Sequence, residues 1–344
     1  MRRILTAAVS AALVAGLTGA TTLHTPGSPG AAPGQAAGTT STPVPAFGHV
    51  FLIIGENTSL FEVNAKTTPY IFNTLKPQGA WLTNYNALHD GSLANYIGMT
   101  SGQFTKCDVN DDLPYNLNTM RPSCHWPGDN LFSQLDAANV SWTEWNESMP
   151  NPCDFFDTGT DWAHDVFSTH HSPAVYYDNI EGARYSENFG KAPKPECLRN
   201  VLPTGGTGPN DMSAFNSSLA SGDVNQFNMV IPNDCQNGHD LCGPPGSGIF
   251  RQFDSFLTQE VPKIEASPAF GSNGLILITY DEWGPSNPPN HKVAFLALGP
   301  LVTPGVFGGG PYNHYSLLRT LEDGFRVSGR LGGAATAKPL PIFK

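Results

Sequence analysis

Carboxylate and amide side chains follow three apolar segments of this 344-residue chain. They lie at 55–58 (Gly-Glu-Asn-Thr), 232–234 (Pro-Asn-Asp) and 281–282 (Asp-Glu). Oxygen atoms of these types are ligands for hard divalent cations. If the three segments are strands of one α/β sheet, their carboxyl ends can meet at the edge where ligands bind. The pattern predicts a metal site, although Asn57 alone also fits a helix N-cap and Asp281 alone a turn.

A hydroxyl group follows the turn at Asp90-Gly91. Ser92 precedes residues 93–99, which have the composition of a helix start. The first N–H groups of a helix are free and favour an anion, so a serine at this position suits a nucleophile or a phosphate site. An ordinary N-cap serine has the same local sequence, and this segment alone leaves both interpretations open.

Several histidines lie in polar loops, where a buried structural role is less common. They include His170-His171 and His239, which precedes Asp240. Imidazole can protonate a leaving alkoxide or bind phosphate oxygens as imidazolium. His291 and His314 stand just ahead of a predicted strand and a predicted helix, and each fits either a structural or a functional role.

Near-continuous apolar runs indicate strands that are covered on both faces. We expect strands at 49–54, 228–231, 275–280 and 293–298, and helices at 68–75, 130–138, 249–264 and 315–325. Strands that alternate with helices predict an α/β fold, with a mainly parallel central sheet and helices on both faces. The stretches 102–127 and 150–209 are rich in Pro, Gly, Asn and Cys, and we interpret them as loop excursions pinned by disulfides.

The amino-terminal residues indicate export. Residues 1–23 have the basic start, short apolar run and small residues of a signal peptide. An uncleaved membrane anchor is the alternative, and it too implies export. Residues 24–45 lack charge and periodicity and are expected to form a disordered tether, followed by a single domain at 46–344. We expect a secreted monomer, with association with the cell envelope as an option and no later transmembrane span.

The six cysteines form an even set, which in an exported chain suggests three disulfides. Pairing by proximity gives 107–124, 153–197 and 235–242, among fifteen formal connectivities. The chain has 29 Asp and Glu against 18 Lys and Arg. This acidic balance argues against a nucleic-acid partner, and it implies that an anionic substrate needs a local cation at the site.

The sequence resembles the phosphoesterase family that contains bacterial phospholipases C and secreted acid phosphatases, within the alkaline-phosphatase-like superfamily. The resemblance is closest to the small secreted acid phosphatases and runs from about residue 49 to 325. Seven collinear segments carry it: His49–Ser59, Ser92–Gly102, Glu147–Cys153, His171–Tyr177, Ile231–Asp240, Thr279–Glu282 and His314–Leu318. Together they are far more specific than any one alone.

This resemblance implies a role for each matching residue. The expected ligands of one divalent cation, such as Ca²⁺ or Mg²⁺, are Glu56, Asn57, Asp281 and Glu282. The expected catalytic residues are the nucleophile Ser92, with His171, His239 and Asp240, which orients His239. The expected substrate-binding residues are Asn95 and Asn233. Metal-assisted attack by the serine would then give a phosphoserine intermediate that water hydrolyses.

Three departures from the family pattern bear on the pocket and on the pH optimum. His89-Asp90-Gly91-Ser92 stands where relatives have His-Pro-Ser, so the histidine is displaced by one residue. Gly55 replaces an acidic residue, and Trp283-Gly284-Pro285 replaces a further acidic run.

The favoured activity is hydrolysis of phosphate monoesters by an acid phosphatase, with a small phosphate ester or a lipid headgroup as partner. A phospholipase C-type phosphodiesterase or a phosphoinositide phosphatase is the alternative among hydrolases. A catalytically inactive secreted binding protein is the alternative from another class.

Overall fold

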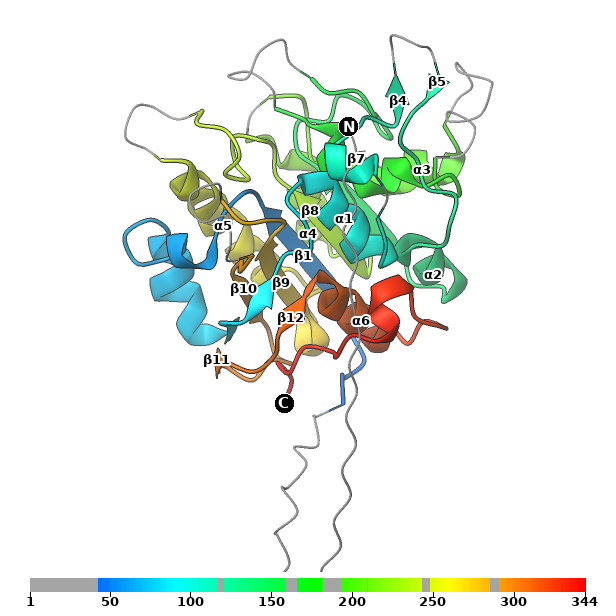
Figure 1. Cartoon of the computed structure of the whole chain (residues 1–344). Helices are drawn as coiled ribbons and strands as arrows, with labels where there is room; N and C mark the ends of the chain where they lie inside the picture. Colours follow the sequence, from blue (N-terminus) through cyan, green and yellow to red (C-terminus); the bar gives the residue numbers. More distant parts are fainter. Residues whose placement is uncertain are drawn as a thin grey trace, which may run out of the picture. The chain divides into compact units, whose positions relative to one another are not determined.

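The computed structural model (Figure 1) describes residues 43–344 except 105, 117–120, 159–165, 182–192, 209, 243–247 and 285–290. The predicted signal peptide and residues 24–42 of the predicted tether lie outside the described residues. Val44 is only 5 % exposed within the core, and its carbonyl accepts a hydrogen bond from Arg326. The ordered domain therefore begins before residue 46.

An eight-stranded sheet forms the centre of the domain. In spatial order its strands are β11 (Gly305–Phe307), β2 (Ala80–Leu82), β10 (Phe295–Leu298), β9 (Leu275–Tyr280), β1 (Val50–Gly55), β8 (Phe227–Ile231), β6 (Trp142–Asn146) and β7 (Val201–Pro203). The pairs from β9 to β7 are all parallel, whereas β10 runs antiparallel to both neighbours. The four predicted strands are present, and the prediction of a mainly parallel sheet is confirmed.

Helices cover both faces of this sheet (Figure 1). They are α1 (Ser92–Ser101), α2 (Leu131–Ala137), α3 (Pro195–Asn200), α4 (Ser213–Ser221), α5 (Ile249–Ala266) and α6 (His314–Gly324). Side chains alternate along β1, so Phe51 contacts Phe215 of α4 and Gly55 abuts Phe253 of α5. Glu56, on the opposite face, contacts α1. The predicted α/β architecture is therefore confirmed.

The predicted helical stretch at 68–75 is present, with Pro69 and Tyr70 in α-helical form ahead of a π-helical turn. A π-helical turn occupies Ile71–Leu75, preceded by Tyr70. The carboxylate of Asp254, on α5, accepts hydrogen bonds from the N–H groups of Tyr70 and Ile71 at 3.0 and 2.8 Å. The carboxylate of Asp254, and not a neighbouring side chain, thus caps the start of this helical turn. The spacing of apolar residues in the sequence cannot reveal such a distant contact.

The region 150–209 is only partly a loop excursion. It contains α3 and β7, and β7 is the outermost strand of the main sheet beside β6. Two short pairs of strands lie outside the main sheet. β3 (Tyr85–Asn86) pairs in parallel with β12 (Tyr312–Asn313), and β4 (Tyr115–Asn116) pairs antiparallel with β5 (Arg121–Pro122). Among the described residues, no helix is both long and apolar enough to cross a membrane.

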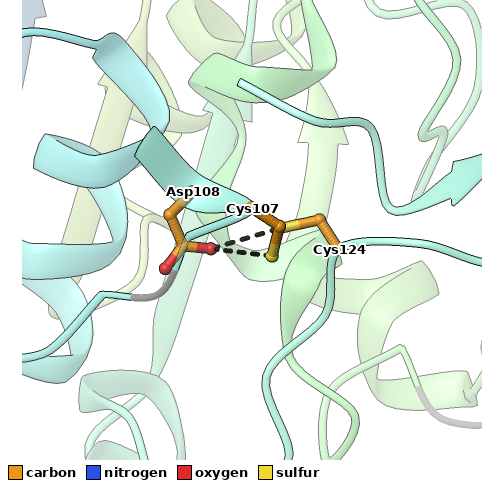
Figure 2. A group of neighbouring side chains, drawn as sticks. All are labelled: Cys107, Asp108 and Cys124. Atoms are coloured by element: carbon orange, nitrogen blue, oxygen red, sulfur yellow. Dashed lines mark hydrogen bonds between the residues drawn. A yellow bond between two sulfur atoms is a disulfide. The ribbon is translucent and has the colours of Figure 1, made fainter. Parts of the chain in front are cut away.

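All three predicted disulfides are present: Cys107–Cys124, Cys153–Cys197 and Cys235–Cys242. Asp108 directs a carboxylate oxygen at the first of them, 3.1 Å from Cys124 Sγ (Figure 2). Cysteines in a disulfide offer no thiolate, so this acidic group beside two sulfur atoms is a packing contact and not a metal centre.

Candidate active site

The parallel register of β1 and β9 brings the predicted metal ligands together. Gly55 pairs with Tyr280, so the next residue of each strand, Glu56 and Asp281, emerges at the same edge of the sheet. The backbone N–H of Asn57 donates a 3.1 Å hydrogen bond to Asp281 Oδ1. Glu282 accepts a 2.7 Å hydrogen bond from Gly91 N–H. We call Glu56, Asn57, Asp281 and Glu282 the strand-end cluster.

The strand-end cluster carries negative charge that its surroundings do not balance. Burial raises the pKa of Glu56 well above its usual value, and the charges of Asp281 and Glu282 add to this. Burial, together with Asp281, raises the pKa of Glu282 to about 9. Within the described residues, neither Lys nor Arg pairs with these carboxylates, and the nearest cationic group is His171, with Nε2 at 3.5 Å from Glu56 Oε1.

The residues of the strand-end cluster fit a divalent cation. Asn57 Oδ1 and Asp281 Oδ2 are buried and lack a hydrogen-bond partner within the described part of the chain. Buried acceptors without partners are uncommon because desolvation is costly. Carboxylate and amide oxygens form the donor set of Ca²⁺ or Mg²⁺. Glu56, Asn57, Asp281 and Glu282 can therefore hold such an ion, as the sequence predicts.

Ser92 is the first residue of α1, and its hydroxyl points at the strand-end cluster. Its Oγ donates to Glu56 Oε2 at 3.1 Å and lies 3.5 Å from Glu282 Oε1. Gly91, the N-cap, has φ 146°, which non-glycine residues rarely adopt. The altered approach 89–92 thus keeps the serine at the helix N-terminus, while the displaced His89 packs beside Phe104.

Tyr96 is a site residue that the sequence argument left without a role. It lies one helical turn after Ser92, and its hydroxyl donates a 2.5 Å hydrogen bond to Glu56 Oε1. Both oxygens of Glu56 are therefore oriented by α1. The i, i+4 spacing of Ser92 and Tyr96 places both side chains on one helix face, which is the signal that could have found it.

A second group, the histidine cluster, consists of His171, Asp234, His239 and Asp240. His171 Nδ1 pairs with Asp234 Oδ1 at 3.0 Å, and both side chains are buried. His239 Nδ1 pairs with Asp240 Oδ1 at 2.8 Å in a more exposed position. The two imidazole rings are 5.9 Å apart between centroids. Each predicted catalytic histidine therefore has its own carboxylate. Asp234, the partner of His171, was not among the predicted site residues.

The charges within the histidine cluster stabilise each other. Burial acts to lower the pKa of His171, but the charge and hydrogen bond of Asp234, together with the charges of Asp281 and Asp111, raise it above its usual value. Burial acts to raise the pKa of Asp234, yet His171 holds it at about 2. The adjacent His170 is held neutral, because burial and the charge of His171 lower its pKa to about 3.

The two predicted substrate-binding amides are engaged in loop structure. Asn95 is fully buried, and its side chain bonds to the backbone of residues 88, 89 and 91. Asn233 bonds through its side chain to Ser148 and to the N–H of Gln236. These contacts indicate that Asn95 shapes the loop before Ser92, and that Asn233 shapes the loop carrying the histidine cluster.

Asp111 is a further carboxylate that the sequence analysis missed. Its Oδ1 accepts a 2.8 Å hydrogen bond from Leu93 N–H, beside the nucleophile candidate. The Cys107–Cys124 disulfide closes the loop that delivers it. No local pattern marks Asp111, because its partner is a backbone group 18 positions away.

The glycine that replaces an acidic residue before Glu56 removes no ligand from the cluster. A Cβ at Gly55 would lie 2.7 Å from ring atoms of Phe253 and Tyr280, on the α5 side of the sheet. A side chain at this position would point away from the strand-end cluster. His291 also has a packing role, since its ring centroid lies 4.0 Å from that of Trp283.

Residues 55–328 match the model of the phosphoesterase family. The chain belongs to this family. It is 25% identical over 293 residues to a probable acid phosphatase of Kluyveromyces lactis, covering 80% of this chain and 58% of that protein. It is 26% identical over 304 residues to a phosphatidylinositol-3-phosphatase of Mycobacterium tuberculosis, covering 88% of this chain and 85% of that one.

A solved structure shares the fold. A protein of the alkaline phosphatase superfamily from Vibrio parahaemolyticus superposes with a TM-score of 0.55 at 12% identity, over 87% of this chain and 72% of that chain. The resemblance inferred from the sequence is thus confirmed at the level of family and fold. The chain spans only 58% of the length of the Kluyveromyces lactis acid phosphatase, so the comparisons establish membership of the phosphoesterase family.

Proposed function

We propose that this protein is a secreted, metal-dependent phosphoesterase, and specifically an acid phosphatase that hydrolyses phosphate monoesters through a phosphoserine at Ser92. One observation carries the proposal. The Ser92 hydroxyl stands at a helix N-terminus, 3.1 Å from Glu56, against a carboxylate cluster that contains buried acceptors without partners. A nucleophile, a cation site and an anion-favouring helix end are thereby adjacent.

The proposed reaction uses the side chains of both clusters. Glu56, Asn57, Asp281 and Glu282 would hold a divalent cation, which would supply positive charge to lower the pKa of the Ser92 hydroxyl and to offset charge on the phosphoryl oxygens. Ser92 gives its proton to a neighbouring carboxylate and its oxygen forms a bond to phosphorus, while the bond from phosphorus to the leaving group breaks.

The histidine cluster supports the remaining steps. His239, oriented by Asp240, donates a proton to the leaving alkoxide. His171, held cationic by Asp234, faces the phosphoryl oxygens and offsets their charge. Water then attacks the phosphoserine, and release of phosphate regenerates Ser92.

A lipid phosphomonoester is the second candidate substrate. The supporting observation is the mutual coverage with the Mycobacterium tuberculosis phosphatidylinositol-3-phosphatase, 88% of this chain and 85% of that protein. The three disulfides support an extracellular location, because such bonds persist in oxidising compartments. A monomer and a phospholipase C-type diesterase activity stay predictions.

The test is hydrolysis of an aryl phosphate monoester between acid and mildly alkaline pH, with and without a chelator. The parent, Ser92→Ala and the control Ser101→Ala are compared. Ser101 is a buried serine on the same helix whose hydroxyl bonds to the carbonyl of Ile97 at 2.8 Å. We expect Ser92→Ala and chelation each to reduce kcat/KM by at least about 1,000-fold, and Ser101→Ala to retain activity.

The other outcomes distinguish the alternatives. Full activity of Ser92→Ala would exclude it as the nucleophile and direct attention to Thr100 and Ser101. A parent inert on aryl phosphates but active on a phosphoinositide monoester or a phospholipid diester would change the substrate assignment. A parent that binds a divalent cation and phosphate but hydrolyses none of these esters would support the inactive binding protein.

A further inference from the structure

A buried chain of hydrogen bonds ends at the backbone of Asp281, one of the residues of the strand-end cluster. The chain runs from Tyr85 on β3 to His314 at the start of α6, and from there to the backbone carbonyl of Asp281. Tyr85 Oη lies 2.9 Å from His314 Nδ1, and His314 Nε2 lies 2.6 Å from Asp281 O. All three residues are essentially inaccessible to solvent.

The donor and acceptor types settle the tautomer of His314. A backbone carbonyl can only accept a hydrogen bond, so Nε2 must carry the proton. A neutral imidazole then has its lone pair on Nδ1, which accepts from the Tyr85 hydroxyl. The carbonyl of Asp281 therefore selects the tautomer, and the Tyr85 hydroxyl holds the ring in place by donating to Nδ1.

The elements that hold this chain are fixed independently of the site. β3 pairs in parallel with β12, which places Tyr85 opposite Tyr312 just ahead of His314. Asn313 caps α6 by accepting from Ser316 N–H at 3.2 Å. The Tyr85 ring also packs on Phe295 of β10, with centroids 4.6 Å apart. These contacts hold the Tyr85 ring in place, and its hydroxyl also interacts with the side chain of Thr279 on β9.

The carboxylate of Asp281 is restrained less fully than its backbone. Oδ1 accepts from Asn57 N–H, while Oδ2 is buried without a partner in the described residues. A carboxylate with one free buried oxygen keeps its direction only if its backbone is held. The short bond from His314 supplies this restraint.

We propose that Tyr85 and His314 are positioning residues for the cation site, acting by fixing the backbone of Asp281 through a single histidine tautomer. The inference rests on the proposed metal centre, but it needs no catalytic turnover. Groups behind metal ligands typically change metal affinity by 10–100-fold when they are removed.

The first measurement is the affinity for Mg²⁺, Ca²⁺ and Mn²⁺, each titrated against a competing chelator. Tyr85→Phe removes the hydroxyl that donates to His314 Nδ1. Tyr280→Phe is the matched control, because its hydroxyl is equally buried and has no partner among the described residues. We expect Tyr85→Phe to raise the Kd about 10-fold and Tyr280→Phe to leave it within about 2-fold.

The second measurement reads the tautomer directly. In the parent labelled with ¹⁵N-histidine, we expect His314 to show a protonated Nε2 and an unprotonated Nδ1, its signals being assigned by their loss in His314→Gln. His314→Gln retains an amide donor and should bind the cation more tightly than His314→Leu. If His314→Leu fails to fold, the cation affinity of Tyr85→Phe and the ¹⁵N signals of His314 still test the proposal.

Several results would overturn the proposal: a protonated Nδ1 on His314, equal changes in Kd for Tyr85→Phe and Tyr280→Phe, or a parent that binds none of the three cations. Failure of the proposed function is separable from these results. A parent that binds a cation, responds to Tyr85→Phe and yet hydrolyses no phosphate ester would retain the positioning role and lose the phosphatase assignment.

Discussion

The strand-end cluster and the histidine cluster lie side by side at one edge of the sheet but handle buried charge in opposite ways. In the strand-end cluster, burial and the charge of Asp281 raise the pKa values of Glu56 and Glu282. In the histidine cluster, each imidazole has a carboxylate within 3.0 Å. The first arrangement has no Lys or Arg partner among the described residues, whereas in the second each carboxylate pairs with an imidazole or shares one's charge. Neutralising a carboxylate should therefore have opposite consequences on the two sides.

The largest expected effect is the loss of stability in Asp234→Asn. Removing one partner of a buried ion pair leaves the other charge uncompensated, which costs about 3–5 kcal/mol. The two ion pairs differ mainly in burial. The side chains of His171 and Asp234 are 2% and 4% exposed. Those of His239 and Asp240 are 32% and 16% exposed. Asp240→Asn should thus change the free energy of unfolding by less than about 1 kcal/mol. Urea unfolding at pH 6 measures both.

The pH dependence checks the same pair. Asp234 has a pKa of about 2 in the folded state against 3.8 when unfolded. Its stabilisation is therefore present above pH 3.8 and is lost as the pH falls towards 2. Asp234→Asn should flatten the acid limb of the stability curve. An unchanged acid limb, or equal losses in Asp234→Asn and Asp240→Asn, would contradict the difference drawn between the two pairs.

The next largest effect is an increase in stability, opposite in sign to that of Asp234→Asn, and we expect it for Glu282→Gln. The folded-state pKa of Glu282, about 9, lies above the unfolded value of 4.5. Its contribution to stability is therefore full below pH 4.5 and is lost as the pH rises towards 9. A full pKa unit corresponds to about 1.4 kcal/mol, and relaxation of the site reduces the total, so we expect Glu282→Gln to stabilise the metal-free protein by about 2 kcal/mol at pH 9 and by little at pH 4.

Chelated and metal-loaded protein are compared at the two pH values by urea unfolding. A bound cation should remove most of the alkaline loss in the parent, because it balances the charge of the ionised carboxylates. Glu282→Gln should show a smaller gain from metal than the parent does. Equal stability of the chelated parent and Glu282→Gln across the range would refute the charge imbalance that we assign to the strand-end cluster.

Sequence patterns found the parts of the fold that depend on local composition. Long apolar runs such as those of β1 and β9 were readable, because every residue of these strands is buried. β6 was missed, because Thr143 and Glu144 lie between its two tryptophans and Asn146 ends the strand. These polar groups are buried but bonded; Glu144, for example, accepts from Ala174 N–H at 2.9 Å. Three-residue strands such as β7 are too short to show any period.

The residues of the candidate site also fall into those that local sequence patterns could predict and those that they could not. The strand-end cluster was predictable because its residues directly follow apolar strands, and the parallel register then brings them together. Asp234 and Asp111 required the folded structure, since their partners His171 and Leu93 lie 63 and 18 positions away. The role of Asn95 could not be read from the sequence either, because a buried amide can serve a ligand or a loop equally well.

The smallest expected effect concerns Asp111, whose carboxylate occupies a backbone donor at the N-terminus of α1. Asp111→Asn keeps an oxygen acceptor for Leu93 N–H but removes a negative charge near Ser92. The exposed neighbour Asp112 lies in the same loop, so Asp112→Asn is the matched control. Because a carboxylate at a helix N-terminus is worth about 0.3–1 kcal/mol, we expect Asp111→Asn to lower stability by this amount.

The same substitution should strengthen binding of the product. With one fewer negative charge beside the nucleophile, inorganic phosphate meets less repulsion, and we expect its inhibition constant to fall about 2–5-fold, equivalent to roughly 0.4–1 kcal/mol. Asp112→Asn should leave the constant unchanged. If Asp111→Asn weakens phosphate inhibition instead, Asp111 orders the helix end for substrate more than it repels it. The charge of Asp111 would then be balanced by its surroundings, as the charges of the histidine cluster are, and unlike those of the strand-end cluster.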